Sequence, residues 1–184
     1  EIYNLIIEDL TFASENLFPK SQMDVGRATS GAAKALLAKV NMYLQNWEEV
    51  KRLTDEIIAS GQYQLQSDYA SLWRESSENG VESIFEVQGL GGPLNLGLQG
   101  YVVSQSVRGQ WGWGFNTPSE DLVNAYDAAG DNIRKNATII FAGETMWDGE
   151  QVIASPPNPR YNEKAYLSRV AETFNGNAWE SNKN

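Results

Sequence analysis

The residues of this sequence that could do chemistry are aromatic side chains with hydrogen-bonding neighbours. They are Trp147 with Asp148, Trp111 with Arg108 and Gln110, and Tyr101 with Gln99. An aromatic ring can stack on the apolar C–H face of a pyranose, while amide, carboxylate and guanidinium groups can bind its hydroxyl groups. These three groups of residues therefore predict a surface that binds sugars.

A purely structural role is the alternative for each of these rings, because tryptophan is highly buried on average. Two further rings, Trp113 and Phe115, run straight into the start of a predicted helix at Thr117, and we expect them in the packed core. Trp47 and Trp73 fall on helical patterns, so we interpret them as scaffold.

A glycine-rich stretch carries several of these rings. Residues 89–115 contain eight of the sixteen glycines of the chain. Glycine lowers the steric barrier to unusual backbone angles, so such a segment can present large rings on a shallow surface. We therefore expect this stretch to form a loop on the ligand side, with Tyr101 and Trp111 on it.

The composition removes several kinds of chemistry. The chain has no histidine and no cysteine, which excludes a Ser-His-Asp triad, a thiolate nucleophile and a Cys/His zinc site. Fourteen basic and twenty-four acidic residues give a net charge of −10, which disfavours nucleic acid and anionic lipid as ligands. Neutral or cationic ligands are the expectation.

Three acidic residues, Glu144, Asp148 and Glu150, lie close together in the sequence. Two carboxylates at the right separation would permit glycoside hydrolysis. Nothing in the sequence isolates one of them in the apolar pocket that raises the pKa of a general acid, however. The group also lacks the regular calcium-loop spacing, so the sequence gives little support for an ion there.

Apolar residues at helical spacing predict three helices in the first third of the chain, over residues 2–17, 30–44 and 47–58. Pro19 stops the first, Ser30 is the expected N-cap of the second, and Gly61 is expected to end the third in a left-handed conformation. With the turn at 45–46, the second and third helices make a hairpin of roughly the 34-residue tetratricopeptide size. Such a hairpin needs neighbours to bury its apolar face.

The rest of the chain changes character. The residue patterns predict strands over 82–88, with Phe85 and Val87 on one side, and over 137–142 (ATIIFA). Residues 117–120 (TPSE) match a capping box, with Thr at the N-cap, Pro at the first helical position and Glu at the third, and the helix is expected to end at Gly130.

Two local features follow this predicted helix. Asp148 and Gly149 are expected to form a hairpin turn, with Trp147 beside the turn and near the surface. Asp131 and Arg134 are three positions apart, which favours an ion pair within the chain over a ligand-binding role.

The order and spacing of several segments resemble the SusD/RagB family of outer-membrane glycan-binding lipoproteins. The segments that carry the resemblance are 24–65, 82–88 (ESIFEVQ), 112–140, 146–150 (MWDGE) and 160–168 (RYNEKAYLS). The resemblance implies a mainly α-helical fold, with a tetratricopeptide-like hairpin scaffold plus an irregular, loop-rich region that has a few short strands. It implies one partial SusD-like domain over 1–184, with the helical part at 1–66 and the ligand-side part at 67–184.

The resemblance also implies a function. Members of that family are tethered at the outer-membrane surface by a lipid anchor and bind oligosaccharides without cleaving them, for delivery to a SusC-like TonB-dependent transporter. On this basis we expect no catalytic residue, no metal and no cofactor. Family members are much longer, and the first residues here lack the pattern of a signal peptide, so we expect this chain to be an internal part of a longer protein.

Two other functions stay open from the sequence. The first is a structural domain that docks a partner protein and binds no sugar, which would present a flat apolar patch instead of rings with polar neighbours. The second is a carboxylate-based glycosidase, which would need two carboxylates facing each other across a cleft about 5 to 10 Å wide.

Overall fold

The computed structural model describes residues 1–88, 102–110, 112–154, 157–166, 168 and 170–172. The chain forms two compact units. The first unit consists of Glu1–Ser67 and Ser77–Gln88, and the second consists of Asp68–Ser76 and Gly89–Asn184. Among the described helices, none is both long and apolar enough to cross a membrane.

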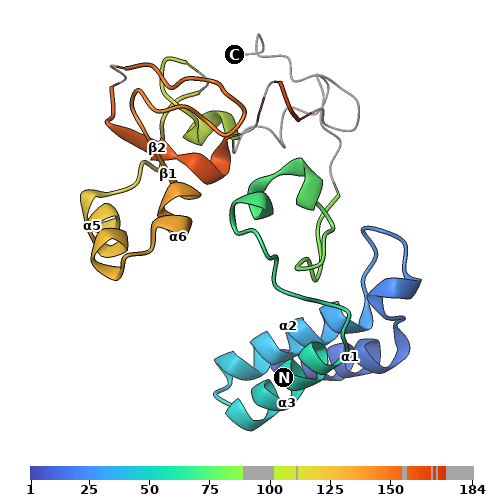
Figure 1. Ribbon diagram of the computed structural model, residues 1–184. Helices are drawn as coiled ribbons and strands as arrows, with labels where there is room; N and C mark the ends of the chain where they lie inside the picture. Colours follow the sequence, from blue (N-terminus) through green and yellow to red (C-terminus); the bar gives the residue numbers. More distant parts are fainter. Residues whose placement is uncertain (89–101, 111, 155–156, 167, 169, 173–184) are drawn as a thin grey trace. The chain divides into compact units, whose positions relative to one another are not determined.

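Three helices build the first unit, and Figure 1 shows them lying side by side. They are α1 (Ile2–Asn16), α2 (Ser30–Tyr43) and α3 (Trp47–Ala59), with the short 3-10 helix η1 (Lys20–Gln22) between the first two. Helix α2 packs against both α1 and α3. The buried core of this packing is Leu37, Ala38 and Leu53, with Ile7 and Leu10 against it. The three predicted helices are therefore confirmed.

The N-cap of α2 lies one residue before the predicted one. Thr29 has an extended backbone, and its hydroxyl oxygen accepts a hydrogen bond from the Ala32 N–H at 3.1 Å. Ser30 is already the first helical residue, so the prediction that it is the cap is wrong. The cap must have a non-helical backbone, and the sequence alone did not tell which of two adjacent hydroxyl residues has it.

The ends of the α2–α3 hairpin follow the sequence closely. Gln45 has a φ of 60° in the turn, where the chain reverses between the helices. Gly61 follows the C-cap of α3 with a φ of 65°, the left-handed conformation that glycine adopts without a steric penalty. The predicted turn and the predicted end of the third helix are both confirmed.

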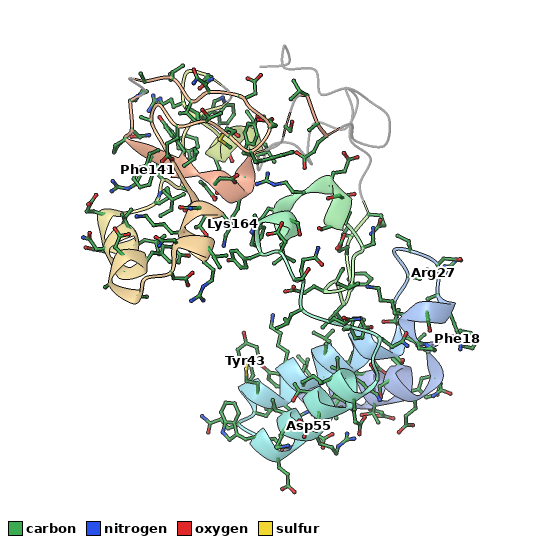
Figure 2. The ribbon with its side chains drawn as sticks, in the orientation of Figure 1. Phe18, Arg27, Tyr43, Asp55, Phe141 and Lys164 are labelled. Carbon is green, nitrogen blue, oxygen red and sulfur yellow. The ribbon has the colours of Figure 1, made fainter. Side chains whose placement is uncertain are left out.

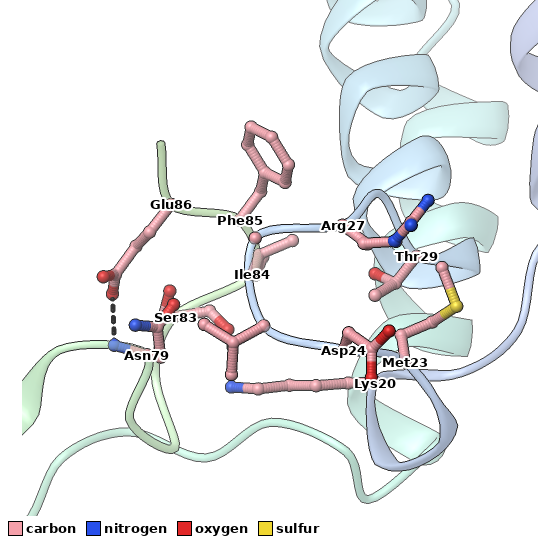
Figure 3. Close-up of a pocket in the computed structure, with 12 residues that line it drawn as sticks. Lys20, Met23, Asp24, Arg27, Thr29, Asn79, Ser83, Ile84, Phe85 and Glu86 are labelled. Atoms are coloured by element: carbon pink, nitrogen blue, oxygen red, sulfur yellow. Dashed lines mark hydrogen bonds between the residues drawn. The ribbon is translucent and has the colours of Figure 1, made fainter. Parts of the chain in front are cut away.

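Residues 82–88 have no strand structure, so the prediction of a strand there is wrong. Two acidic side chains of this segment bind backbone N–H groups instead. Glu82 accepts a hydrogen bond from Gln66 at 2.8 Å, and Glu86 accepts one from Asn79 at 2.9 Å (Figure 3). A strand needs a neighbouring strand to pair with its backbone groups, and alternating residues alone do not supply that partner.

The second unit combines short helices with a small antiparallel sheet. Its elements are η2 (Ala70–Trp73), α5 (Glu120–Ala129), α6 (Asn132–Asn136), β1 (Ile139–Phe141), β2 (Arg160–Asn162) and η4 (Glu163–Ala165), while η3 (Glu75–Ser77) ends where the chain returns to the first unit. In the sheet, Ile140 lies opposite Tyr161. Their side chains join a buried cluster with Val107, Met146, Val152 and Tyr166. The strand predicted over 137–142 is confirmed as the shorter β1.

The start of α5 differs from the predicted capping box. Ser119 is the N-cap, and its hydroxyl accepts a hydrogen bond from the Leu122 N–H at 3.2 Å. Thr117 as N-cap is therefore wrong, and Glu120 becomes the first helical residue, where it pairs with Arg160 at 2.8 Å. Either Thr117 or Ser119 could cap a helix chemically, and the ion pair with a distant arginine could not be read from the sequence.

The C-terminal end of α5 and the start of α6 agree with the predictions from the sequence. Gly130 ends α5 with a φ of 65°, as expected. The predicted ion pair of Asp131 with Arg134 is confirmed, and Asp131 also caps α6 by accepting a hydrogen bond from the Arg134 N–H at 3.1 Å.

Trp113 and Phe115 are not in the core, so that expectation is wrong. Their side chains are 58% and 59% exposed, and the two rings contact each other edge to face with centroids 6.1 Å apart. Gly114, between them, is the residue that faces the core. A Cβ on Gly114 would lie 2.9 Å from the ring of Tyr161 and 2.7 Å from the Cβ of Arg108. Close packing of the Gly114 backbone against Tyr161 thus leaves the two rings at the surface.

This packing makes a testable prediction for Gly114→Ala, with Gly109→Ala as its matched control. Both glycines have a left-handed φ, 70° and 82°, but nothing lies within 4 Å of a Cβ at Gly109. We expect Gly109→Ala to cost about 1 kcal/mol for the backbone alone, and Gly114→Ala to cost a further 1 to 3 kcal/mol, roughly, because of overlap with Tyr161. Urea unfolding of the three proteins measures both values. Equal losses would contradict the packing described here.

Candidate functional site

Trp147 lies in a hairpin turn of the second unit. Thr145 pairs with Gln151 across the hairpin, and Gly149 has a φ of 92° at the turn. Met146 is buried, whereas the side chain of Trp147 is 47% exposed. The predicted turn and the predicted surface position of Trp147 are both confirmed.

Arg74 packs on the ring of Trp147. The carbon at the centre of its guanidinium group lies 4.7 Å from the centroid of the indole. A guanidinium group at this distance is attracted to the negative face of the ring, and the attraction grows when water is excluded. The indole is therefore supported by a charged group that is itself only 10% exposed.

Glu163 holds the guanidinium group of Arg74 in place. The Nη2 atom of Arg74 donates to both carboxylate oxygens of Glu163, at 2.8 and 3.0 Å, and Nη1 donates to the backbone oxygen of Tyr166 at 3.0 Å. Because Nη2 is held by the carboxylate and Nη1 by a backbone oxygen, both the position and the orientation of the guanidinium group are fixed. Arg74 thus links the turn that carries Trp147 to η4.

Burial makes Glu163 an unusual acid. Desolvation raises the pKa of the Glu163 carboxyl from 4.5 to about 7, although the charge and hydrogen bonds of Arg74 favour the ionised form. The negative charges of Glu172 and Asp148 add to the rise in pKa. The ion pair therefore titrates near neutral pH.

The next residue of η4 makes a second contact to η2. The Nζ atom of Lys164, labelled in Figure 2, lies 4.4 Å from the ring centroid of Trp73 and donates a hydrogen bond to the hydroxyl of Tyr69 at 2.9 Å. Tyr69 and Trp73 also pack edge to face. Consecutive residues of η4 thus fasten the segment that carries Arg74.

Asp148, which the sequence predicts as a sugar contact, is already bound on both oxygens. One accepts the Glu150 N–H at 3.0 Å, and the other accepts the hydroxyl of Tyr166 at 2.6 Å. Burial opposes ionisation of Asp148, but hydrogen bonds from Ser168, Tyr166 and the Glu150 N–H outweigh it and lower its pKa. These contacts give Asp148 a role in shaping the turn, and its contact with a sugar stays a prediction.

Trp147 and Arg74 together line two open hollows of the second unit. One, of about 380 Å³, is also lined by Asn136, Phe141, Glu144 and Thr145. The other, of about 420 Å³, is also lined by Glu75, Ser76 and Glu172. Sites for small ligands have volumes of about 300 to 1,000 Å³ and carry a few polar groups that fix orientation. Both hollows meet this description.

The other predicted site residues lie in the glycine-rich stretch 89–115. In the described part of this stretch, residues 102–105 are helical, so the expectation of a loop is wrong there, and a loop follows them. Trp111, Tyr101 and Gln99 lie outside the described residues. Arg108 is exposed on this loop. Gln110 binds the hairpin instead of solvent, since it donates to the backbone oxygen of Gln151 at 2.6 Å and accepts from the Ile153 N–H at 3.0 Å.

A further hollow lies in the first unit and is smaller, about 90 Å³. Figure 3 shows the charged side chains at its rim, Lys20, Asp24, Arg27 and Glu86. The Nζ atom of Lys20 donates to the backbone oxygens of Gly80 and Ser83, at 2.5 and 2.8 Å. Its charge therefore holds the 80–83 turn, and the hollow is too small for a sugar ring with its neighbours.

The sequence did not point to the residues that support Trp147. Arg74 and Glu163 are 89 positions apart, and neither belongs to a recognisable local motif. The only signal was that Glu163 and Tyr166 fall in the segment RYNEKAYLS, which carries part of the family resemblance.

The raised pKa of Glu163 predicts how stability depends on pH. Between about pH 4.5 and 7 the folded protein keeps a proton on Glu163 that the unfolded chain has released, so the stability of the native protein falls as pH rises through this range. Relative to Glu163→Gln, we expect a loss of roughly 3 kcal/mol across it, since one pKa unit corresponds to about 1.4 kcal/mol. Urea unfolding of both proteins between pH 4 and 8.5 measures this difference. A difference that does not change with pH would contradict the assignment.

Comparison with known proteins identifies relatives of this chain. No family model matches it. A SusD-like protein of Bacteroides ovatus is 30% identical over 161 residues, which are 78% of this chain and 29% of that protein. A SusD-like protein of Formosa agariphila is 29% identical over 119 residues, 60% of this chain and 22% of that protein. The chain thus spans less than a third of the length of these curated relatives.

Solved structures agree with this relationship. A SusD-like protein of Bacteroides fragilis matches 88% of this chain and 41% of its own chain, with 25% identity and a TM-score of 0.68. Surface glycan-binding protein A of Bacteroides fluxus matches 89% and 38%, with 26% identity and a TM-score of 0.67. The protein of that name from Bacteroides thetaiotaomicron, solved in complex with laminarihexaose, matches 89% of this chain and 41% of its own chain, with a TM-score of 0.65. At 23% identity, this match supports the fold alone.

The predicted fold class, mainly helical with a few short strands, is confirmed by these matches. The tetratricopeptide-like detail of the hairpin stays a prediction. Both curated relatives and the solved structure from Bacteroides fragilis are named SusD-like, and the chain belongs to the SusD-like family.

Proposed function

We propose that this chain contributes a non-catalytic surface that binds neutral oligosaccharides, centred on Trp147. The observation that carries the proposal is the half-exposed indole of Trp147, which is supported by Arg74 and lines two hollows large enough for small ligands. A pyranose can stack on the exposed part of such a ring.

The polar neighbours of Trp147 favour a sugar over an apolar protein surface. Asn136, Glu144 and Thr145 line the same hollow as the indole and offer amide, carboxylate and hydroxyl groups. Sugar hydroxyl groups need such partners, because a hydroxyl that loses water without a new hydrogen bond costs binding energy. A flat patch made only of rings would not supply them.

The names of the relatives support the same ligand class. Several structural neighbours are named surface glycan-binding proteins, and one was solved in complex with laminarihexaose. For the whole protein, we extend the proposal to delivery of oligosaccharides to a SusC-like TonB-dependent transporter at the outer-membrane surface, with attachment through a lipid anchor. The family relationship supports this part of the proposal.

The acidic residues support binding without cleavage. The carboxyl with a pKa near 7, Glu163, lines the 380 Å³ hollow but is only 8% exposed, and both of its oxygens accept from Arg74, so it is engaged in an ion pair and not free to give a proton to a substrate. Glu144 accepts the Phe141 N–H at 2.8 Å, and Asp148 is bound on both oxygens. Within the described ranges, no group of three acidic side chains is placed to hold a metal ion.

A second candidate function has its own observation. Trp113 and Phe115 form an exposed aromatic pair, more apolar in character than the surroundings of Trp147. Exposed aromatic pairs are common in surfaces that dock proteins. We propose this pair as the place where a partner protein would bind if the chain serves an interaction function.

The test compares Trp147→Ala with Trp47→Ala. The second variant removes the same kind of exposed side chain from helix α3, away from the proposed site. Isothermal titration with laminarihexaose, cellohexaose, maltohexaose and xylohexaose measures affinity, and a reducing-end assay on the same samples measures cleavage. We expect binding of at least one sugar with no new reducing ends. Trp147→Ala should weaken it about tenfold or more, because stacking is lost, whereas Trp47→Ala should change it less than about twofold.

Other results would separate the alternatives. Binding that Trp147→Ala leaves intact and Trp113→Ala abolishes would move the sugar site to the aromatic pair. New reducing ends would overturn the non-catalytic proposal. A folded protein that binds none of a wider panel of neutral glycans would contradict the glycan-binding proposal.

A further inference from the structure

We infer that Arg74 and Glu163 act as positioning residues for Trp147, and that their ion pair makes ligand binding at Trp147 depend on pH around neutrality. Where it concerns glycan binding, this inference rests on the function proposed above. Where it concerns the ring of Trp147 itself, it can be tested without a ligand.

Three groups are connected by successive direct contacts. The carboxylate of Glu163 binds the Nη2 atom of Arg74 through both oxygens, and the same guanidinium group lies on the indole of Trp147. All three side chains line the 380 Å³ hollow. Any change in how Glu163 holds Arg74 therefore reaches the wall of the hollow through a direct contact.

The protonation state of Glu163 changes this hold. An ionised carboxylate accepts two charge-assisted hydrogen bonds from one arginine, whereas a protonated carboxyl keeps one good acceptor oxygen and gains a donor that Arg74 cannot accept. Protonation thus removes the ion pair and leaves Nη2 of Arg74 with one good acceptor oxygen in place of two. The guanidinium group then keeps its contact to the Tyr166 backbone oxygen but loses the partner that fixes its orientation.

The charged groups around Glu163 place this change near neutral pH. From the segment before η3 it faces Arg74, from the hairpin it faces Asp148, and from the end of the described chain it faces Glu172. The carboxylate of Glu144 lines the same hollow, and Lys164 on the same 3-10 helix is directed to Tyr69 and Trp73. One cation against several carboxylates, in a buried setting, keeps the proton on Glu163 to a pKa of about 7.

The expected direction follows from preorganisation. Above pH 7 the ion pair holds Arg74, Arg74 holds the ring, and a ligand meets a wall that is already in place. Below pH 7 the ring loses part of this support, and the ligand must restrict it on binding. We expect the affinity of the native protein to fall about threefold to tenfold from pH 8 to pH 5.5, with a midpoint near 7.

The experiment combines two readouts on the same set of proteins. The first is the affinity for the best oligosaccharide of the panel between pH 5 and 8.5. The second, which needs no sugar, is the emission of Trp147, obtained as the difference between the native protein and Trp147→Phe across the same range. The matched variants are Glu163→Gln, which cannot ionise, and Asp121→Asn, which removes an exposed carboxylate from the first turn of α5, outside the lining of both hollows. Circular dichroism monitors the fold of each variant at each pH.

In the native protein and in Asp121→Asn, we expect both readouts to change with a midpoint near pH 7. In Glu163→Gln, we expect both to be flat over this range, with the affinity close to that of the native protein at low pH. If Glu163→Gln does not fold, Arg74→Met replaces it, because methionine keeps much of the apolar length of the side chain but can neither pair with Glu163 nor place a charge on the indole. It should flatten both readouts in the same way.

The outcomes distinguish this inference from the proposed function. Sugar binding with no midpoint near 7 in the native protein, or a midpoint that persists in Glu163→Gln, would overturn the inference and leave the glycan proposal standing. A midpoint in Trp147 emission that Glu163→Gln abolishes, without binding of any sugar, would support the positioning role and contradict the glycan proposal.

Discussion

The buried ion pair between Arg74 and Glu163 fixes the surroundings of Trp147. It joins a short segment before η3 to η4, across 89 positions of the sequence, and it places a cation on the face of an indole. A buried ion pair adds little net stability, because desolvation offsets the attraction, but removing one partner is costly. Its contribution is to select one arrangement of the hairpin turn and η4, and through it one orientation of the Trp147 ring.

The sequence predicted elements that depend on local patterns and failed where distant contacts decide. The three helices of the first unit follow from the spacing of their apolar residues, and the turn of Trp147 follows from Asp148 and Gly149. The strand predicted over 82–88 does not form, because a strand requires a pairing partner, and the pattern of its own residues does not reveal one. The prediction that Trp113 is buried is wrong because Gly114 packs on Tyr161 in place of its two aromatic neighbours. Tyr161 is far along the chain, so the sequence did not reveal this contact.

The sequence predicted the aromatic residue of the candidate site, Trp147, but not the residues that support its ring, Arg74 and Glu163. Trp147 next to Asp148 suggested a ring with a polar partner, yet Asp148 binds Tyr166 and the backbone of the turn, and the charged partner on the ring is Arg74. The local charge balance also differs from what a catalytic site needs. The carboxyl of Glu163, whose pKa is raised, is buried in an ion pair, which suits a wall that holds its shape and not a group that transfers a proton.

The measurement that tests the central claim most directly is a two-dimensional NMR titration that follows the indole N–H signals of the six tryptophans as a neutral oligosaccharide is added. Trp147→Phe and Trp47→Phe assign the two signals that matter. Our account predicts that the Trp147 signal moves saturably with the sugar while the Trp47 signal stays in place. Saturable movement of other tryptophan signals, with the Trp147 signal unchanged, would contradict it.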